Sequence, residues 1–330
     1  MTDFTDLVDL AAERLGGAVL LANDEFFAPK EALLHPGPAE WREGVYTDRG
    51  KWMDGWETRR RRTPGHDWCL IRLGLPGVVR GVVVDTSYYR GNFPEACMLE
   101  GAEVVGVPDP AQLDADPTVA WTTLVPRSPL VGDARNAFAV AVGRRVTHLR
   151  LAIYPDGGVA RLRVHGDVKP GADLLTPGRE VDLAAMEHGA YVVVCSDMFF
   201  GHRQNLILPG RSTHMGDGWE TKRRRGPGHD WTIVRLAARG SIRRIELDTD
   251  HYKGNAPGSC MLEWCDAPDA TADALVHSRG WRELRAQTPL QPHARHVWEA
   301  PGGVNATHVR LSIYPDGGVA RLRLPGTLAQ

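Results

Sequence analysis

The chain has 330 residues with a formal net charge of −2 at pH 7, and 42% of its residues are hydrophobic. This length can supply two domains with full cores, and the balanced charge excludes a protein that a global field draws to nucleic acid or to an anionic membrane. Its apolar tracts are shorter than the ~18 residues of a membrane helix, and its start lacks the basic region of a signal peptide. The five cysteines form no CxxC pair, which argues against a disulfide framework and a structural zinc site. We therefore expect a reduced, cytoplasmic protein.

The first predicted element is a short helix at the start of the chain. The apolar residues that fall on one helical face are Phe4, Leu7, Val8, Ala11 and Leu15. The pair Gly16-Gly17 then supplies a stop signal. The letters VDLAA at 8–12 return at 181–185, so a second such helix is expected there.

The rest of the chain has the pattern of short strands and frequent turns. VVRGVVVDT (78–86) and IRRIELDT (242–249) predict strands, and YVVVCSD (191–197) predicts a strand buried on both faces. LRLAIY and VARLRV alternate apolar and polar residues around PDGG (155–158), which predicts a hairpin. With 36 glycines and 23 prolines, this pattern favours an all-β sandwich or jelly roll.

Long motifs occur twice in the same order. DGWETRRRRTPGHDW (54–68) returns at 217–231 with thirteen of fifteen residues identical, and THLRLAIYPDGGVARLR (147–163) returns at 307–323 with fifteen of seventeen. Between them, DTSYYRGNFPEACMLE (85–100) returns at 248–263 with ten of sixteen. The chain is therefore a tandem duplication. We expect a first repeat at 5–166, a Pro- and Gly-rich linker at 167–176 and a second repeat at 177–326.

The charged and aromatic residues of the first motif have two interpretations. Its tryptophans suit core or edge packing, and an arginine run normally forms a solvated face. In a strand, however, alternate arginines point to opposite faces, so some of them must meet a carboxylate or an anionic ligand. The polar pairs that both copies keep include Asp54/Asp217, Glu57/Glu220, Arg60/Arg223, His66/His229, Asp67/Asp230 and Asn92/Asn255. Because folding alone rarely preserves so many polar groups, the pattern favours a site for a small anion.

Other kinds of site find less support. The sequence lacks a GxSxG elbow, a phosphate-binding glycine loop and the signatures of RNA-binding modules. Metal ligation by His66 and Asp67 stays open, but adjacent residues in a strand point apart and no HxH or HExxH spacing is present. We expect no cofactor.

The repeated DGWET[RK]RRR-x-PGHDW, DT-x-x-Y-[RK]-GN and IYPDGGVAR motifs resemble those of allantoicase, and the resemblance extends from about residue 5 to residue 326. It implies two tandem jelly-roll-like β-sandwich modules. It also implies a hydrolase of C–N bonds in linear amidines that converts allantoate to (S)-ureidoglycolate and urea in purine degradation, and a homo-oligomer.

This reaction needs an acid, a base and a clamp for the substrate carboxylate. The catalytic candidates are Glu57, His66 and Asp67 in the first repeat and Glu220, His229, Asp230 and His251 in the second. The candidates for substrate binding are Trp56, Arg60 and Asn92 and their counterparts Trp219, Arg223 and Asn255. The second repeat has Asp250-His251 where the first has Ser87-Tyr88, so we expect the second to lead, with a composite site as the alternative.

Two further classes of protein stay open at this stage. Tandem jelly rolls also occur as small-ligand or carbohydrate-binding proteins without catalysis. A relative that has lost its activity is the other alternative, although the ionisable residues are intact in both copies.

Overall fold

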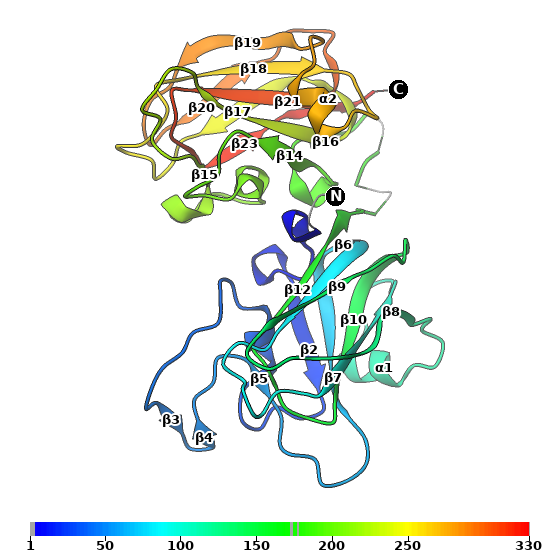
Figure 1. Cartoon of the computed structure of the whole chain (residues 1–330). Coiled ribbons are helices and arrows are strands. Elements are labelled where there is room, and N and C mark those ends of the chain that lie inside the picture. Colours follow the sequence, from blue (N-terminus) through cyan, green and yellow to red (C-terminus); the bar gives the residue numbers. More distant parts are fainter. Residues whose placement is uncertain (1–3, 172–173, 177, 330) are drawn as a thin grey trace. The chain divides into compact units, whose positions relative to one another are not determined.

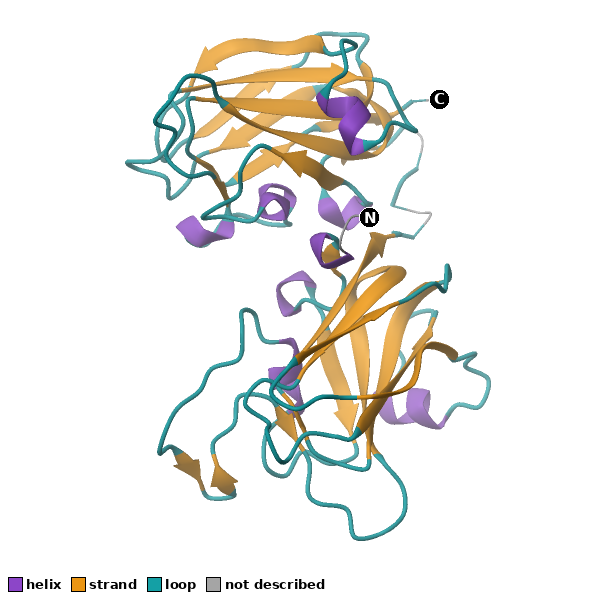
Figure 2. Ribbon diagram, in the orientation of Figure 1, coloured by secondary structure: helices purple, strands orange, loops and turns teal. Residues whose placement is uncertain are grey.

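A computed structural model describes residues 4–171, 174–176 and 178–329. The chain divides into two compact units, with the boundary between Lys169 and Pro170. Both units consist mainly of antiparallel strands joined by turns, as Figures 1 and 2 show. Residues 172–173, in the expected linker, and residue 177, the expected start of the second repeat, lie outside the described residues.

The first unit contains these strands: β1 (Val8–Asp9), β2 (Ala18–Ala22), β3 (Tyr46–Thr47), β4 (Gly50–Lys51), β5 (Trp56–Glu57), β6 (Asp67–Asp85), β7 (Ala96–Ala102), β8 (Thr122–Pro129), β9 (Arg135–Ala139), β10 (Arg145–Tyr154), β11 (Gly158–Val159) and β12 (Arg161–Val168). Its helical elements are the 3₁₀ turns η1 (Phe4–Asp6), η2 (Glu13–Leu15) and η3 (Lys30–Leu34) and the helix α1 (Pro110–Ala115).

The second unit repeats this order: β13 (Glu180–Asp182), β14 (Tyr191–Cys195), β15 (Trp219–Glu220), β16 (Asp230–Ile242), β17 (Arg244–Asp248), β18 (Ser259–Cys265), β19 (Arg282–Pro289), β20 (Arg295–Glu299), β21 (Asn305–Tyr314), β22 (Gly318–Val319), β23 (Arg321–Arg323) and β24 (Pro325–Leu328). Its helical elements are η4 (Met186–His188), η5 (Arg203–Ile207), η6 (Met215–Asp217) and α2 (Ala272–Val276).

Strand β6 organises the sandwich of the first unit. Its first half pairs with β2 and β10, and its second half pairs with β9 and β12. Strands β7 and β8 extend the sheet beyond β10, and β1 extends it beyond β12. Val82, Val83 and Val84 are all buried, as expected for a strand covered on both faces. One long apolar strand therefore belongs to both halves of the β-sandwich.

The second unit has the same arrangement with its long strand divided in two. Strand β16 pairs with β14 and β21 through its first half and with β24 near its end. The following strand, β17, pairs with β20 and β23 in a separate three-stranded sheet. The fold class expected from the sequence, two all-β jelly-roll-like modules, is confirmed.

The helix expected at the start of each repeat is wrong. Val8–Asp9 forms a strand that pairs with Gly166 and His165 of β12. A single 3₁₀ turn follows and ends at Gly16, whose φ of 95° is left-handed, so only the stop signal was correct.

The physical reason is the side chain of Asp9. Its Oδ1 accepts the backbone N–H of Ala11 at 3.2 Å and the N–H of Val164 at 2.9 Å. Asp182 makes the equivalent two bonds in the second repeat, at 3.0 and 2.8 Å. An aspartate that bonds nearby backbone groups competes with the helix, and here the bond to a distant strand fixes an extended start.

The PDGG segment is a turn, but the expected hairpin is wrong. Strands β10 and β12 lie on either side of it, and both pair with β6 rather than with each other. The turn binds the first motif instead. The carbonyl of Gly157 accepts the N–H of Thr58 at 3.2 Å, and Asp156 Oδ2 accepts the N–H of Arg61 at 2.8 Å. The strand predicted at 191–197 is β14, but only Val192 is buried in it.

Candidate active site

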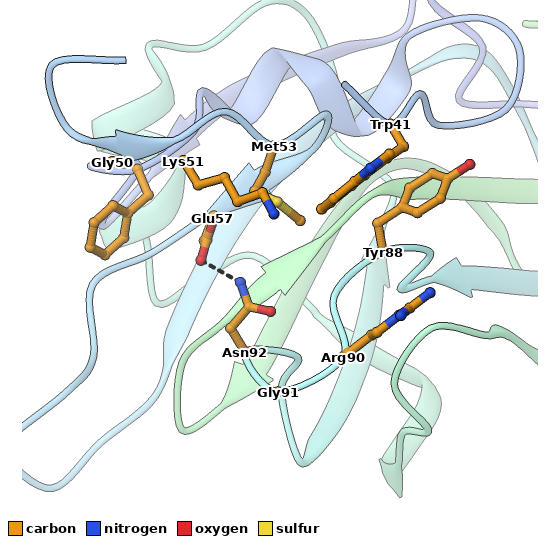
Figure 3. A pocket seen from close by; sticks show the side chains of 10 residues that line it. Trp41, Gly50, Lys51, Met53, Glu57, Tyr88, Arg90, Gly91 and Asn92 are labelled. Carbon is orange, nitrogen blue, oxygen red and sulfur yellow. Dashed lines mark hydrogen bonds between the residues drawn. The ribbon is translucent and has the colours of Figure 1, made fainter. Parts of the chain in front are cut away.

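A cavity of about 580 Å³ lies in the first unit. Three segments form it: the loop that carries β3 and β4, the end of β5, and the loop that follows β6. The residues that line it are Phe27, Trp41, Gly50, Lys51, Met53, Glu57, Tyr88, Arg90, Gly91 and Asn92 (Figure 3). It brings together two of the predicted residues, Glu57 and Asn92.

Glu57 is the carboxyl group of this cavity. Asn92 Nδ2 donates to Glu57 Oε1 at 2.8 Å, and the two side chains face each other in Figure 3. The backbone of Glu57 is fixed by pairing with Gly158 of β11 and by bonds with Ala28. Burial raises the pKa of Glu57, and the bond from Asn92 opposes that rise. A carboxyl group that holds its proton more tightly than usual can act as a general acid.

The cavity also presents two cationic side chains, Lys51 and Arg90, and three aromatic ones, Phe27, Trp41 and Tyr88. Lys51 Nζ lies 4.0 Å from the ring centroid of Trp41, and the Trp41 and Tyr88 rings are 5.6 Å apart with a 33° interplanar angle. Arg90 Nε donates to Asp133 Oδ2 at 3.0 Å. The lining thus carries Lys51, Arg90 with its partner Asp133, and the Glu57 carboxyl group, and it suits an anionic ligand that has flat, apolar-faced groups.

Tyr89 holds the loop that carries Tyr88 and Asn92. Its ring is fully buried, and it packs against Gly158 so closely that a Cβ there would lie 1.8 Å from Tyr89 Cε1. The N–H of Gly158 also donates to the carbonyl of Asn92 at 2.8 Å. The second glycine of PDGG is therefore needed for the loop to reach the cavity.

The burial of Trp56 and Trp219 favours the packing interpretation over the predicted substrate contacts. Both side chains have an exposed fraction of 0%, so neither ring faces a ligand. The indole Nε1 of Trp56 donates to the carbonyl of Asp24 at 2.8 Å, and that of Trp219 donates to Asp197 at the same distance. The packing interpretation is the correct one for this pair.

Asp67 and Asp230, predicted as catalytic, are buried and ion-paired in the structure. Each is 1% exposed. Arg61 Nη1 lies 2.6 Å from Asp67 Oδ1, and Arg224 forms the same ion pair with Asp230. Carboxylates that are buried and paired in this way hold the inward-pointing member of each arginine run.

Arg60 and Arg223, the predicted clamps, are exposed, and Arg60 is not among the residues that line the cavity. The expectation that one side of the run points inward holds for the next residue, Arg61 or Arg224. The sequence could not show this because residues 58–66 form an irregular segment rather than a strand.

The predicted histidines are not among the residues that line the Glu57 cavity. His66 packs on Tyr154, with ring centroids 4.8 Å apart, and His229 packs on Tyr314 at 4.5 Å. His229 lines a different cavity, of about 230 Å³, together with Glu263. Burial lowers the pKa of His229. His66 thus contacts Tyr154, and the cavity lining does not support its predicted grouping with Glu57 around one substrate.

His251 occupies the position of Tyr88 in the second unit. Both residues have left-handed backbones, with φ of 70° and 69°. The ring of His251 faces the carbonyl of Ser212 at 3.1 Å and lies 6.0 Å from the ring of His293.

The second unit keeps the Glu–Asn pair but surrounds it differently. Asn255 Nδ2 donates to Glu220 Oε1 at 2.6 Å, and it also lies 3.3 Å from the sulfur of Met215. Twenty-six residues lie between Phe27 and Asp54, but only sixteen lie between Phe200 and Asp217. The longer segment of the first repeat carries β3 and β4 and, with them, one wall of the cavity.

Sequence reasoning missed most of the cavity lining, including Phe27, Trp41, Lys51, Tyr88 and Arg90. One signal could have found part of it. The offset between the repeats drops from 173 to 163 between the NDEFF and DGWET motifs, which marks the extra segment in the first repeat. Extra loop residues on a shared scaffold commonly carry function.

The described residues include no group of three or more His, Cys, Asp or Glu side chains placed to hold a metal ion. Within the same residues, no helix has the length and apolar character that a membrane span requires. The five cysteines are free thiols, and four of them are buried.

Comparison with known proteins gives the same repeat structure. A family model of the allantoicase repeat matches the chain twice, over residues 8–169 and 181–329. The chain belongs to the allantoicase family. It is 48% identical to a protein named probable allantoicase 1 from Burkholderia mallei, over 97% of this chain and 94% of the relative. It is also 48% identical to a probable allantoicase from Streptomyces coelicolor, over 99% of this chain and 87% of the relative.

Solved structures agree with the family. The crystal structure of allantoicase from Saccharomyces cerevisiae matches with a TM-score of 0.79 and 34% identity, covering 97% of this chain and 92% of the yeast chain. A second allantoicase structure matches with a TM-score of 0.82 and 33% identity, covering 98% and 94%. The resemblance found in the sequence motifs is confirmed, and family membership disfavours a carbohydrate-binding protein without catalysis.

Proposed function

We propose that the chain carries out the allantoicase reaction, the hydrolysis of allantoate to (S)-ureidoglycolate and urea, in the cavity around Glu57 and Asn92. The observation that supports this placement is a half-buried carboxyl group with a raised pKa, oriented by an amide in a cavity whose lining also includes Lys51 and Arg90. Allantoate is a carboxylate whose neighbouring carbon carries two ureido groups. The lining offers a partner for each part of it.

The substrate carboxylate suits Arg90 and Lys51. A guanidinium group can bind both carboxylate oxygens, and an ammonium group adds a second charge. The flat ureido groups suit the space between Trp41 and Tyr88, whose faces are apolar. In this orientation the carbon between the ureido groups lies towards Glu57.

Glu57 then transfers the proton that the reaction requires. Its protonated carboxyl group gives that proton to the ureido nitrogen that leaves as urea, and the C–N bond breaks. The nitrogen of the remaining ureido group shares the positive charge that develops on the carbon. Water adds to this carbon, and its proton returns to the Glu57 carboxylate. Asn92 keeps the carboxyl group oriented in both steps through its 2.8 Å hydrogen bond.

This assignment moves the leading role from the second repeat, which Asp250-His251 favoured in the sequence, to the first. The Glu–Asn pair is common to both repeats. The loop with Trp41 and Lys51, however, belongs to the longer segment of the first repeat. A carboxylate clamp built from Lys51 therefore exists only beside Glu57.

The test is a urea-release assay with purified protein and allantoate. We expect urea and ureidoglycolate in equal amounts. We also expect the activity to survive treatment with EDTA, because one carboxylate and one amide are too few protein ligands for a resident divalent ion. Failure to release urea under any condition would exclude the reaction. Activity lost with EDTA and restored only by a divalent ion would exclude the metal-independent mechanism.

We also propose that the protein is a cytoplasmic homo-oligomer. Free thiols suit a reducing compartment. Phe199 and Phe200 are 70% and 62% exposed, whereas their counterparts Phe26 and Phe27 are 39% and 37% exposed. An exposed aromatic pair of this kind suits a contact with a second copy. Sedimentation velocity of the wild-type protein and of a Phe199→Ser, Phe200→Ser variant would test this, and a monomeric wild type would refute it.

A further inference from the structure

The loop between β8 and β9 supports the cavity without lining it. Asp133, in this loop, uses both of its carboxylate oxygens. Oδ1 accepts the backbone N–H of Tyr88 at 2.8 Å, and Oδ2 accepts Arg90 Nε at 3.0 Å. Tyr88 and Arg90 both line the cavity. One side chain therefore anchors two parts of the proposed binding site.

Asp133 is itself held firmly. Its backbone N–H donates to the carbonyls of Thr86 and Tyr89, at 3.2 and 3.1 Å, and its φ is 51°. The bond to Tyr88 also stabilises a costly backbone, because a non-glycine residue at a φ of 69° is strained. Loss of this bond would let the loop relax and move the Tyr88 ring away from Trp41.

In the second repeat a histidine replaces Asp133, and the contacts of this position differ. His293 occupies the same position, with the same φ of 51°, and its Nδ1 accepts the N–H of His251 at 2.9 Å. A single ring nitrogen serves the backbone there. An imidazole has no second carboxylate oxygen like the one that holds Arg90 in the first repeat, and the His293 Nδ1 lies 2.8 Å from Asp250 Oδ1 instead.

We propose that Asp133 is a positioning residue of the first-repeat site, which sets the affinity for the substrate carboxylate by fixing Arg90 and the Tyr88 backbone. This inference depends on the proposed function of the cavity. Asp133 acts through Arg90 and Tyr88 and does not touch the substrate. Because the carboxylate must be ionised to hold Arg90, it matters that the bond from the Tyr88 N–H lowers the pKa of Asp133.

The experiment compares Asp133→Asn, Asp133→Ala, Arg90→Gln and the double variant Asp133→Asn, Arg90→Gln. The asparagine keeps an oxygen for the Tyr88 N–H but loses the charge that holds Arg90. We expect its KM for allantoate to rise about tenfold with kcat nearly unchanged, on the scale of one charge-assisted hydrogen bond. The alanine, which also loses the Tyr88 bond, should lower kcat as well. The double variant should be no worse than Arg90→Gln alone, because both changes remove the same interaction.

Two controls accompany these variants. Asp116→Asn removes an exposed aspartate that caps a local turn through the Thr118 N–H at 2.8 Å, and it should leave KM unchanged. His293→Asn makes the matched change in the second repeat and should also leave KM unchanged. Additive effects of Asp133→Asn and Arg90→Gln, or a normal KM in Asp133→Asn, would overturn the inference. Glu57→Gln is measured in parallel. If it keeps full kcat, the proposed function of the cavity fails; if only the Asp133 variants behave normally, this inference alone fails.

Discussion

Replacement of Glu57 by glutamine tests the proposed chemistry most directly. Glutamine has nearly the same shape and keeps an oxygen that can accept the 2.8 Å bond from Asn92, but it has no proton to transfer. A positioned general acid or base contributes about 10²–10⁴-fold to the rate, so we expect kcat to fall by that factor. KM should change little, because the cationic clamp is intact.

The stability of the same variant gives an independent check, with a defined sign. Burial raises the pKa of Glu57, so the folded protein holds this proton more tightly than the unfolded chain does. The stabilising contribution of Glu57 is complete below the pKa of the unfolded chain and is lost as the pH rises through the folded pKa. Glutamine stays neutral. The melting temperature of Glu57→Gln should therefore match wild type at low pH and equal or exceed it at neutral pH.

The assay measures urea release and melting temperature for Glu57→Gln and for its counterpart in the second repeat, Glu220→Gln. The counterpart keeps its own bond from Asn255 and should retain wild-type kcat. Normal kcat in Glu57→Gln would refute the acid role. Equal loss in both variants would show that the reaction is not confined to the first repeat. A fall in the melting temperature of Glu57→Gln at neutral pH would mean that the side chain is structural.

Three further changes test other parts of the structure. Lys51→Gln should raise the KM for allantoate by about 10–100-fold, the scale of a hydrogen bond to a charged group, and an unchanged KM would remove Lys51 from the clamp. Asp67→Asn leaves the Arg61 guanidinium without its buried partner, so it should lower the free energy of unfolding by about 3–5 kcal/mol in urea titrations, whereas the kcat of folded molecules is kept. Burial lowers the pKa of His308 to about 4, so stability should be lost as the pH falls from about 6.5 towards 4. His308→Gln should flatten that pH dependence, and an equally steep profile in the variant would contradict the assignment.

The duplication, the all-β class and most strands could be predicted because they depend on local signals. Alternating apolar residues and repeated motifs do not require knowledge of distant partners. The prediction of a helix around VDLAA was wrong because the conformation of this segment depends on Asp9, whose side chain bonds to Val164 at a separation of 155 residues. The prediction of a hairpin at PDGG was wrong for a similar reason, since β6 lies between the two strands that the turn connects. The conformation of both segments is determined by long-range pairing, which local sequence patterns do not show.

The candidate site depends even more on long-range contacts that the sequence does not show. Glu57 and Asn92 were identified because both repeats keep them, and the structure brings them together. The sequence also favours a chemical role for the remaining polar residues of the motif, because both repeats keep them. The structure supplies those partners: Asp54 binds Arg161 at 2.5 Å, and Asp67 binds Arg61. Preservation of a polar residue in two copies is thus evidence for an interaction, which can be internal.

The repeated motif is best explained as a structural element that fixes β5 and the PDGG turn against the sandwich. In our proposal, one of its two copies also carries the reaction. In both repeats the motif threonine and the inward-pointing arginine donate their backbone N–H groups to the turn, to Gly157 and Asp156 in the first and to Gly317 and Asp316 in the second. This common frame places a Glu–Asn pair at the same point twice. What differs is loop length: the longer segment of the first repeat provides Trp41 and Lys51, whereas Met215 packs on the pair in the second. The scaffold therefore explains the duplication, and the longer loop of the first repeat supplies Trp41 and Lys51 to the cavity that we propose as the anion-binding site beside Glu57.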